Sequence, residues 1–307
     1  MKKKAAKEIY TLADLKNWNE AVVPPIRLGV LGDPVKHSLS PQIQNAAFNE
    51  YKINMQYARF EISAPQLRDA FDIIRGLDFA GLNLTVPHKI AAIDLLDEID
   101  EIASEAGAVN TIKIENEKFL GFNTDGEGFG RAVREEFSVD LRDLRIMVLG
   151  AGGAARAIAL HCAREKCERL VIVNRDVEKA KKLAATLRQY FAEPKVFGPV
   201  ARLQALPLDE RAIESQIGNL DLIVNATPQG LNRRDPPPIS SRLLVPHLMV
   251  FDTNYSADGH TRLVIAALEA GARAADGLSM LLHQGALAFE IWFDRPVPLN
   301  AMRQSLK

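Results

Sequence analysis

The chain has 307 residues, of which 47% are hydrophobic and 25% are charged, and its formal net charge at pH 7 is −1. A chain of this length is expected to form two domains, because single hydrophobic cores rarely grow to that size. The near-zero charge gives no reason to expect a nucleic acid or an anionic membrane as a partner.

Nothing in the sequence predicts export or metal binding. The lysines at positions 2–4 are not followed by the apolar core of a signal peptide, and no stretch is long and uncharged enough to span a bilayer. Cys162 and Cys167, the two cysteines, form neither a C-x-x-C pair nor a zinc set. We therefore expect unpaired thiols, no metal and a cytoplasmic protein.

The first half alternates strand and helix patterns after an N-terminal appendage at residues 1–25, in which Thr11 is predicted to cap a short helix. Strands are predicted at 26–31, 56–61, 79–85, 108–114 and 119–123, and helices at 41–51, at 63–76 and from the turn that holds Pro87.

The second half repeats this order. Strands are predicted at 146–149, 170–174, 222–225 and 249–252, with helices between them, and two helices close the chain, at 280–292 and from 299. The alternation predicts an α/β fold of two domains, in which a domain with a mostly parallel sheet precedes a second α/β domain.

A glycine-rich turn opens the second half. Gly150, Gly152 and Ala155 fit the G-x-G-x-x-G/A pattern between a strand and a helix, where small residues let a pyrophosphate approach the backbone. The N–H groups at the helix start would then bind the phosphates. Glycine clusters also form ordinary tight turns, so this motif alone leaves both interpretations open.

The residues after the next strand indicate which dinucleotide is preferred. An NAD-binding domain places an acid about 20 residues beyond the glycines, but this chain has Asn174 and Arg175 there, and Lys179 follows one helical turn later. Arg175 and Lys179 could clamp a 2′-phosphate, which favours NADP. A surface role for Arg175 is the alternative.

Polar side chains gather at four predicted strand ends in the first half. They are Ser38 and Ser40; Asn83, Thr85 and Lys89; Asn110; and Asn123, Thr124 and Asp125. Each group has an ordinary explanation when it is considered alone. Ser40 could cap a helix, Lys89 could be a solvated surface lysine, and the residues around Asn123 could form a turn. Four such groups in succession instead favour a small polyhydroxylated substrate, because each buried hydroxyl needs a hydrogen-bond partner.

These segments together resemble the shikimate dehydrogenase family. The matching motifs are 37–41, 83–89, 107–111, 123–126, 150–157, 225–230 and 277–286, and the resemblance covers about residues 26–292. It implies a shikimate-binding domain at 1–125, a Rossmann NADP-binding domain at 126–277, C-terminal helices at 278–307 that return to the first domain, and an active site in the cleft between the domains.

The resemblance also assigns roles to individual residues in the reversible reduction of 3-dehydroshikimate to shikimate. Shikimate would be bound by Ser38, Ser40, Asn83, Thr85, Asn110, Asp125, Tyr255 and Gln284. NADP would be bound by Gly150, Ala151, Gly152, Gly153, Ala154, Ala155, Asn174, Arg175, Lys179, Thr227, Thr253, Gly277 and Met280.

Lys89 matches the catalytic lysine of the family, with Asp125 as its neighbour. A free lysine has a pKa near ~10.4 and a nearby carboxylate favours its ammonium form, so we expect Lys89 to act mainly as a general acid. Asp125 would position it and bind a substrate hydroxyl.

Three departures from the family pattern leave the specificity open. They are Asp176 beside the expected phosphate site, Gln44 where shikimate-specific members usually have His, and Ser256-Ala257 after Tyr255. The nearest alternative is a quinate/shikimate dehydrogenase that uses NAD or NADP. A non-catalytic NADP-binding sensor and a folate dehydrogenase of the same plan fit the polar residues less well. The resemblance is compatible with a monomer or a homodimer.

Overall fold

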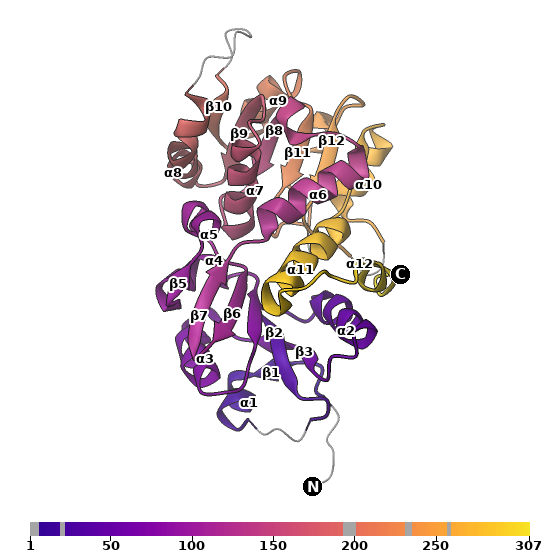
Figure 1. The fold of residues 1–307 in the computed structure, drawn as a ribbon. Coiled ribbons are helices and arrows are strands. Elements are labelled where there is room, and N and C mark those ends of the chain that lie inside the picture. The colour runs from indigo at the N-terminus through magenta and orange to yellow at the C-terminus, as the bar shows by residue number, and fades with distance from the viewer. Residues whose placement is uncertain (1–5, 19–21, 193–200, 231–234, 257–258) are drawn as a thin grey trace. The chain divides into compact units, whose positions relative to one another are not determined.

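The computed structural model describes residues 6–18, 22–192, 201–230, 235–256 and 259–307. It divides into two compact units, residues 1–124 with 281–307, and residues 125–280 (Figure 1). Both units contain a sheet with helices on its faces, so the predicted α/β class is confirmed. No helix among the described residues is long and apolar enough to cross a membrane.

The first unit contains a seven-stranded sheet with the strand order β1-β3-β2-β4-β6-β7-β5. Its strands are β1 (Tyr10–Thr11), β2 (Ile26–Gly32), β3 (Gln56–Glu61), β4 (Gly81–Leu84), β5 (Glu98–Ile99), β6 (Thr111–Glu115) and β7 (Lys118–Phe122). β6 runs antiparallel to β4 and β7, and the other pairs are parallel. The antiparallel pair follows from the two-residue turn at Asn116 and Glu117, which both have positive φ, as a tight hairpin requires.

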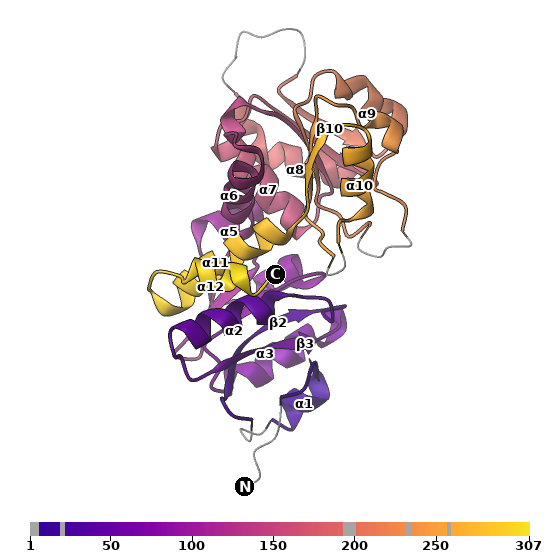
Figure 2. The same cartoon turned by 90° about the vertical axis from the view of Figure 1, so that its right-hand side faces the viewer.

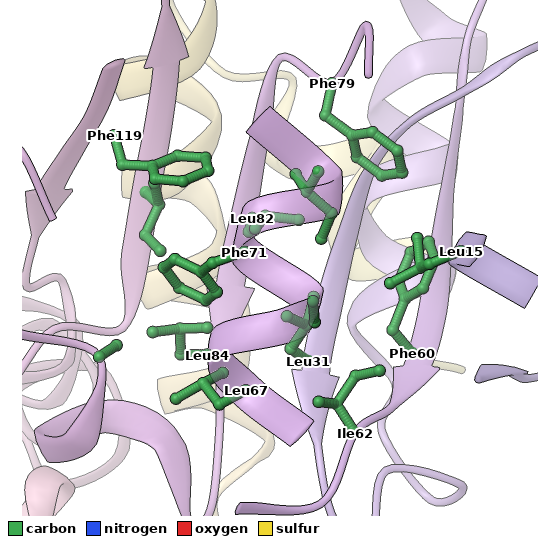
Figure 3. Close-up of a cluster of buried hydrophobic side chains, with 14 of the residues drawn as sticks. Leu15, Leu31, Phe60, Ile62, Leu67, Phe71, Phe79, Leu82, Leu84 and Phe119 are labelled. Carbon is green, nitrogen blue, oxygen red and sulfur yellow. The ribbon is translucent and has the colours of Figure 1, made fainter. Parts of the chain in front are cut away.

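The helices of this unit cover both faces of its sheet. They are α1 (Leu12–Lys16), α2 (Ser40–Glu50), α3 (Leu67–Arg75), α4 (His88–Ala91), α5 (Glu101–Ala106), α12 (Leu299–Gln304) and the part of α11 (Leu278–Phe293) from Leu281 onward. Figure 3 shows α3 against the sheet, with Phe71 near Phe119. Their ring centroids are 5.1 Å apart in a cluster of buried aromatic and aliphatic side chains.

The N-terminal appendage belongs to this core. Thr11 and Asp14 form the predicted capping box at the start of α1. Tyr10 packs against Phe60 and Trp18, while β1 extends the sheet beyond β3. The residues from 1 to 5 and from 19 to 21 lie outside the described part of the appendage.

The second unit contains a six-stranded, fully parallel sheet with the order β10-β9-β8-β11-β12-β13. Its strands are β8 (Arg145–Leu149), β9 (Arg169–Asn174), β10 (Leu203–Pro207), β11 (Leu222–Asn225), β12 (Met249–Asp252) and β13 (Arg273–Ala275). Counted within this unit, the order is 3-2-1-4-5-6, that of a doubly wound dinucleotide-binding sheet whose order reverses between β8 and β11.

Figure 2 shows helices on both sides of this second sheet. They are α6 (Asp125–Phe137), α7 (Gly153–Arg164), α8 (Val177–Leu187), α9 (Glu210–Ile217) and α10 (Arg262–Glu269). Gly126 lets α6 approach α7 closely, because a Cβ there would lie 2.7 Å from the carbonyl oxygen of Ala157. Cys162 and Cys167 are buried free thiols, as predicted.

Several predicted boundaries were wrong. The strand predicted at 79–85 is only Gly81–Leu84, and the one predicted at 108–114 begins at Thr111. The helix expected after Pro87 is a single turn, and Pro87 precedes it as the capping residue. Strands β1, β5, β10 and β13 and helix α5 were not predicted. Three of these strands have only two or three residues, too few for an alternating pattern to be visible.

Candidate active site

The polar residues of the first unit gather near strand ends, as the sequence predicts: near the carboxyl ends of β2, β4 and β7 and at the start of the antiparallel strand β6. Ser38 follows β2, and its carbonyl oxygen accepts a hydrogen bond from Nε of Arg59 at 2.9 Å. The Ser38 hydroxyl accepts the backbone N–H of Ser40 at 3.3 Å. Ser40 is the first residue of α2 and Leu39 is the capping residue, so the alternative in which Ser40 caps this helix was wrong.

Asn83 lies on β4 within a buried hydrogen-bond network. Its Nδ2 donates to the carbonyl oxygen of Asn110 at 3.1 Å and to Oγ1 of Thr111 at 3.0 Å. Its Oδ1 accepts the hydroxyl of Tyr57 at 2.8 Å. Both amide protons are therefore used inside the protein, and the second lone pair of Oδ1 is the acceptor through which Asn83 can contact a ligand.

Asn110 directly precedes β6 and contacts both the residues after β7 and helix α11. Its Oδ1 accepts the backbone N–H of Thr124 at 2.8 Å, and its Nδ2 donates to Oγ1 of Thr124 at 2.9 Å. Nδ2 also lies 3.3 Å from Oε1 of Gln284 on α11. Residues 174 positions apart in the sequence, both predicted to bind the substrate, therefore meet in one unit.

Thr85 follows β4, and Lys89 is the second residue of the short helix α4. Thr85 approaches the end of β2 so closely that a Cβ on Gly32 would lie 2.3 Å from its methyl carbon. The residue before Lys89, His88, is fully buried, and its Nε2 lies 2.7 Å from the carbonyl oxygen of Ile62. Burial lowers the pKa of His88, so the imidazole is neutral at pH 7 and anchors the turn that carries the half-buried Lys89.

The remaining predicted substrate residues lie in the second unit. Asp125 is the first residue of α6, and Tyr255 follows β12. These two elements fix the positions of Asp125 and Tyr255 within the second unit. The residues after Tyr255 depart from the family pattern; of these, Ser256 is described and Ala257 lies outside the described residues.

The glycine-rich turn has the geometry that a pyrophosphate requires. Gly150 has a φ of +117°, which favours glycine, and a Cβ there would lie 2.8 Å from the carbonyl oxygen of Ala226. Beside Gly152 a Cβ would meet no atom within 4 Å, so this side of the turn is open. Ala155 is fully buried where α7 packs on the sheet. The first N–H groups of α7, from Gly153 and Ala154, therefore border open space, which fits a bound dinucleotide.

The basic residues after β9 are free to bind an anion. Arg175 and Lys179 are exposed, and neither makes an ion pair within the described chain. Nδ2 of Asn174 donates to the carbonyl oxygen of Asp176 at 2.9 Å. The Asp176 carboxylate accepts the N–H of Glu178 at 3.1 Å and caps α8.

The other predicted cofactor residues follow β11, β12 and β13. Thr227 donates its hydroxyl to Oδ1 of Asn225 at 2.7 Å. A Cβ on Gly277 would lie 2.2 Å from the carbonyl oxygen of Thr253, so only glycine permits this contact. Met280 lies in the first turn of α11. Within the described residues, no group of three His, Cys, Asp or Glu side chains could hold a metal ion.

The sequence analysis did not identify the residues that support this site. Tyr57 and Thr111 hold Asn83, and Arg59 holds Ser38. Thr111 begins β6 directly opposite Asn83 on β4, and this pairing is the signal that could have identified it. Tyr57 and Arg59 lie near the start and the middle of β3, where the sequence carries no such signal.

A doubly wound sheet with a glycine turn at its first strand, joined to a second α/β unit with polar strand ends, defines a dinucleotide-dependent enzyme class. The shikimate dehydrogenase substrate binding domain matches residues 30–112, the shikimate/quinate 5-dehydrogenase model matches 131–229, and the shikimate 5′-dehydrogenase C-terminal domain matches 277–307. The chain belongs to the shikimate dehydrogenase family.

Individual relatives agree with this assignment. The shikimate dehydrogenase (NADP(+)) of Methanopyrus kandleri is 41% identical over 281 residues, which are 91% of this chain and 94% of that protein. The solved structure of the Thermus thermophilus shikimate 5-dehydrogenase with NADP(H) and shikimate has a TM-score of 0.77 and 31% identity, over 92% of this chain and 98% of that one. Quinate dehydrogenase from Corynebacterium glutamicum with NAD has a TM-score of 0.76 and 29% identity, over 91% and 98% of the two chains.

Proposed function

We propose that this chain catalyses the NADP-dependent, reversible reduction of 3-dehydroshikimate to shikimate. The observation that carries this proposal is that this chain combines two sets of residues, one suited to the substrate and one suited to the cofactor. The buried polar side chains at the strand ends of the first unit suit a hydroxyl-rich acid, and the exposed pair Arg175 and Lys179 follows the second strand of a dinucleotide-binding sheet. The Methanopyrus kandleri relative is named a shikimate dehydrogenase (NADP(+)).

The first unit would bind the substrate through groups that the fold already holds in place. Ser38 and Ser40 are fixed by the start of α2, and Asn110 is fixed by Thr124 and Gln284. Such preorganised hydroxyl and amide groups lose little conformational entropy when the ligand binds. They would orient the ring so that one carbonyl faces the reducing agent.

Lys89 would supply the proton in this reaction. The ammonium group of a lysine donates a proton to a carbonyl oxygen as negative charge develops there during hydride arrival. Asp125 would position Lys89 and bind a substrate hydroxyl. In the reverse direction Lys89 takes the proton back from the alcohol.

NADPH, when bound, supplies the hydride. The N–H groups at the start of α7 would hold its pyrophosphate beside Gly152, and Arg175 and Lys179 would hold its 2′-phosphate. Thr227, Thr253 and Gly277 would border the other half of the cofactor.

Initial rates with shikimate and with quinate, each with NAD and with NADP, test the assignment. We expect the highest kcat/KM for shikimate with NADP. A higher kcat/KM for quinate with NAD would instead establish the quinate/shikimate alternative, which Asp176 supports because its carboxylate lies beside the expected phosphate site and would repel a 2′-phosphate.

The variant Lys89→Ala tests the proposed chemistry. We expect kcat to fall by about 10²–10⁴-fold while the Michaelis constant of the keto substrate changes little, because the proton is transferred only in the transition state. Lys16→Ala, which removes an exposed lysine of α1, is the matched control and should leave both constants unchanged. Near-normal turnover by Lys89→Ala would exclude the proposed role.

A further inference from the structure

Two fully buried polar residues, Asn225 and Asp252, end the neighbouring strands β11 and β12. They face each other in the strand register, and Nδ2 of Asn225 donates to Oδ1 of Asp252 at 2.9 Å. We propose that Asn225 and Asp252 are positioning residues for the nicotinamide half of the cofactor, acting through the loops after β11, β12 and β13. This inference rests on the NADP-dependent function proposed above.

Asn225 fixes the loop after β11. Its Oδ1 accepts both the backbone N–H of Thr227 at 3.1 Å and the Thr227 hydroxyl at 2.7 Å. Its Nδ2 also donates to the carbonyl oxygen of Gln229 at 3.1 Å. The amide thus determines where Thr227, a proposed cofactor residue, presents its backbone and methyl group.

Asp252 fixes the loop after β12 and the start of α10. Its Oδ1 accepts the backbone N–H of Asn254 at 3.1 Å, and its Oδ2 accepts the Thr261 hydroxyl at 2.7 Å. Thr261 in turn caps α10 by accepting the N–H of Val264. Both carboxylate oxygens are therefore used to hold backbone and side chains of this one unit.

Asn254 joins these loops to each other and to the loop after β13. Its Nδ2 donates to the carbonyl oxygen of Thr227 at 2.9 Å, and its own carbonyl oxygen accepts the N–H of Gly277 at 2.9 Å. Thr227, Thr253 and Gly277 are thereby held by one connected network, which begins at the Asn225–Asp252 pair.

The position of this network in the sheet indicates which half of the cofactor it serves. In a doubly wound sheet each set of three strands binds one mononucleotide at its carboxyl ends. The glycine turn, Arg175 and Lys179 belong to the half formed by β8, β9 and β10. The half formed by β11, β12 and β13 remains for the nicotinamide nucleotide.

A fully buried carboxylate is an unfavourable way to stabilise these loops. Burial raises the pKa of Asp252 to about 6, although several donors contact it. A buried polar network of this kind is explained better by a need to fix geometry than by a gain in stability.

The test compares two ligands, NADPH and adenosine 2′,5′-bisphosphate, which contains only the adenosine half with its 2′-phosphate. Asn225→Asp replaces the donor toward Asp252 with a second carboxylate oxygen. We expect the dissociation constant of NADPH to rise on the order of tenfold or more, because a repulsive contact replaces a buried hydrogen bond. The dissociation constant of the bisphosphate should stay within about twofold. Asn219→Asp adds the same charge at an exposed site of this unit and is the matched control.

A pH series separates positioning from general damage to the fold. Two adjacent carboxyl groups share a proton as the pH falls, and the shared proton restores a donor between residues 225 and 252. The ratio of the two dissociation constants in Asn225→Asp should therefore approach the wild-type ratio as the pH falls from about 8 to about 6. The ratio in Asn219→Asp should follow the wild type throughout.

Several outcomes would overturn the inference. They are an unchanged dissociation constant of NADPH in folded Asn225→Asp, an equal loss of affinity for both ligands, or a ratio of the two dissociation constants that does not change with pH. If Asn225→Asp does not fold, Thr261→Val removes one donor from Asp252 and should give the same selective loss at smaller size; unchanged NADPH binding there would contradict the inference. Wild-type protein that binds both ligands but does not turn over 3-dehydroshikimate would contradict the proposed function and leave this inference standing.

Discussion

Nε2 of Gln44 on α2 donates a hydrogen bond to the carbonyl oxygen of Gly285 on α11 at 2.8 Å. Gln44 is completely buried, and its Oε1 has no hydrogen-bond partner among the described residues. Gln44 lies one helical turn after Ser40, and Gly285 follows Gln284 directly. This contact therefore sets the spacing between two helices that each carry a proposed substrate residue.

Gln44→Met tests this relationship. The substitution removes one hydrogen bond, worth about 1 kcal/mol, and also removes an unpaired buried oxygen that costs about 1–3 kcal/mol. We expect the free energy of unfolding in urea to stay equal or to rise by up to about 2 kcal/mol. The Michaelis constant of the keto substrate should rise on the order of tenfold, because the two helices lose their fixed spacing.

Gln42→Met is the matched control for this experiment, since Gln42 is exposed on the same helix. It should change neither the stability nor the Michaelis constant. A Gln44→Met protein with lower stability and an unchanged Michaelis constant would mean that Gln44 serves the core alone.

Gly81 on β4 leaves room for the indole of Trp292. A Cβ at Gly81 would lie 2.3 Å from Nε1 of Trp292 and 2.6 Å from the carbonyl oxygen of Ile112, to which that Nε1 donates at 2.9 Å. Gly81→Ala must displace the indole, and we expect a loss of about 1–3 kcal/mol in the free energy of unfolding. Urea denaturation followed by tryptophan emission measures both effects.

Gly76→Ala is the control for the change in backbone entropy. A Cβ at Gly76 would have its nearest contact at 3.7 Å, so this variant should differ little from the wild type. Equal stability of the two variants would contradict the packing argument.

The sequence predicted those elements best whose side-chain pattern is set by burial. β3, β11 and β12 have the predicted bounds, because an apolar or alternating run ends abruptly at each strand end. The capping box at Thr11 was also visible, since it depends on residues three positions apart. Short edge strands such as β5 and β13 carry no pattern, because they are specified by the strands beside them.

The site was predictable only where residues carry a motif. The glycine turn and Arg175 were visible from their spacing along the chain. Gln44 was not visible as a buried residue, because its side chain is polar, although it lies one turn before Phe48 on the buried face of α2. Asn225 and Asp252 are fixed by the pairing of two strands, which a single sequence does not show.

Arg175 and Lys179 are expected to decide between NADPH and NADH. Arg175→Ala should raise the KM of NADPH about tenfold to a hundredfold, because a hydrogen bond between charged groups is lost. The KM of NADH should not change, since NADH has no 2′-phosphate. The same loss should appear in the wild type as the salt concentration rises, because exposed charges are screened.

Lys182→Ala removes an exposed lysine of the same helix α8 and should leave the KM of NADPH unchanged. Parallel losses of NADPH and NADH in Arg175→Ala would mean that Arg175 supports the fold of the loop and does not contact the phosphate.

Asp252 should make the stability of the second unit fall as the pH rises. Burial raises its pKa from 3.8 to about 6, so the folded unit holds a proton that the unfolded chain has already lost. Its contribution is therefore fully present below pH 3.8 and is lost as the pH rises through about 6, and the shift corresponds to about 3 kcal/mol.

The variant Asp252→Asn has no titrating group at this position. Carboxylates with lowered pKa values, such as Asp221, act in the opposite direction but cancel when the two proteins are compared. Urea denaturation of both proteins should show the free energy of unfolding of Asp252→Asn, relative to the wild type, increasing by about 2 kcal/mol between about pH 4 and about pH 7. A difference that stays constant over this range would show that Asp252 has the same pKa in the folded and unfolded chain.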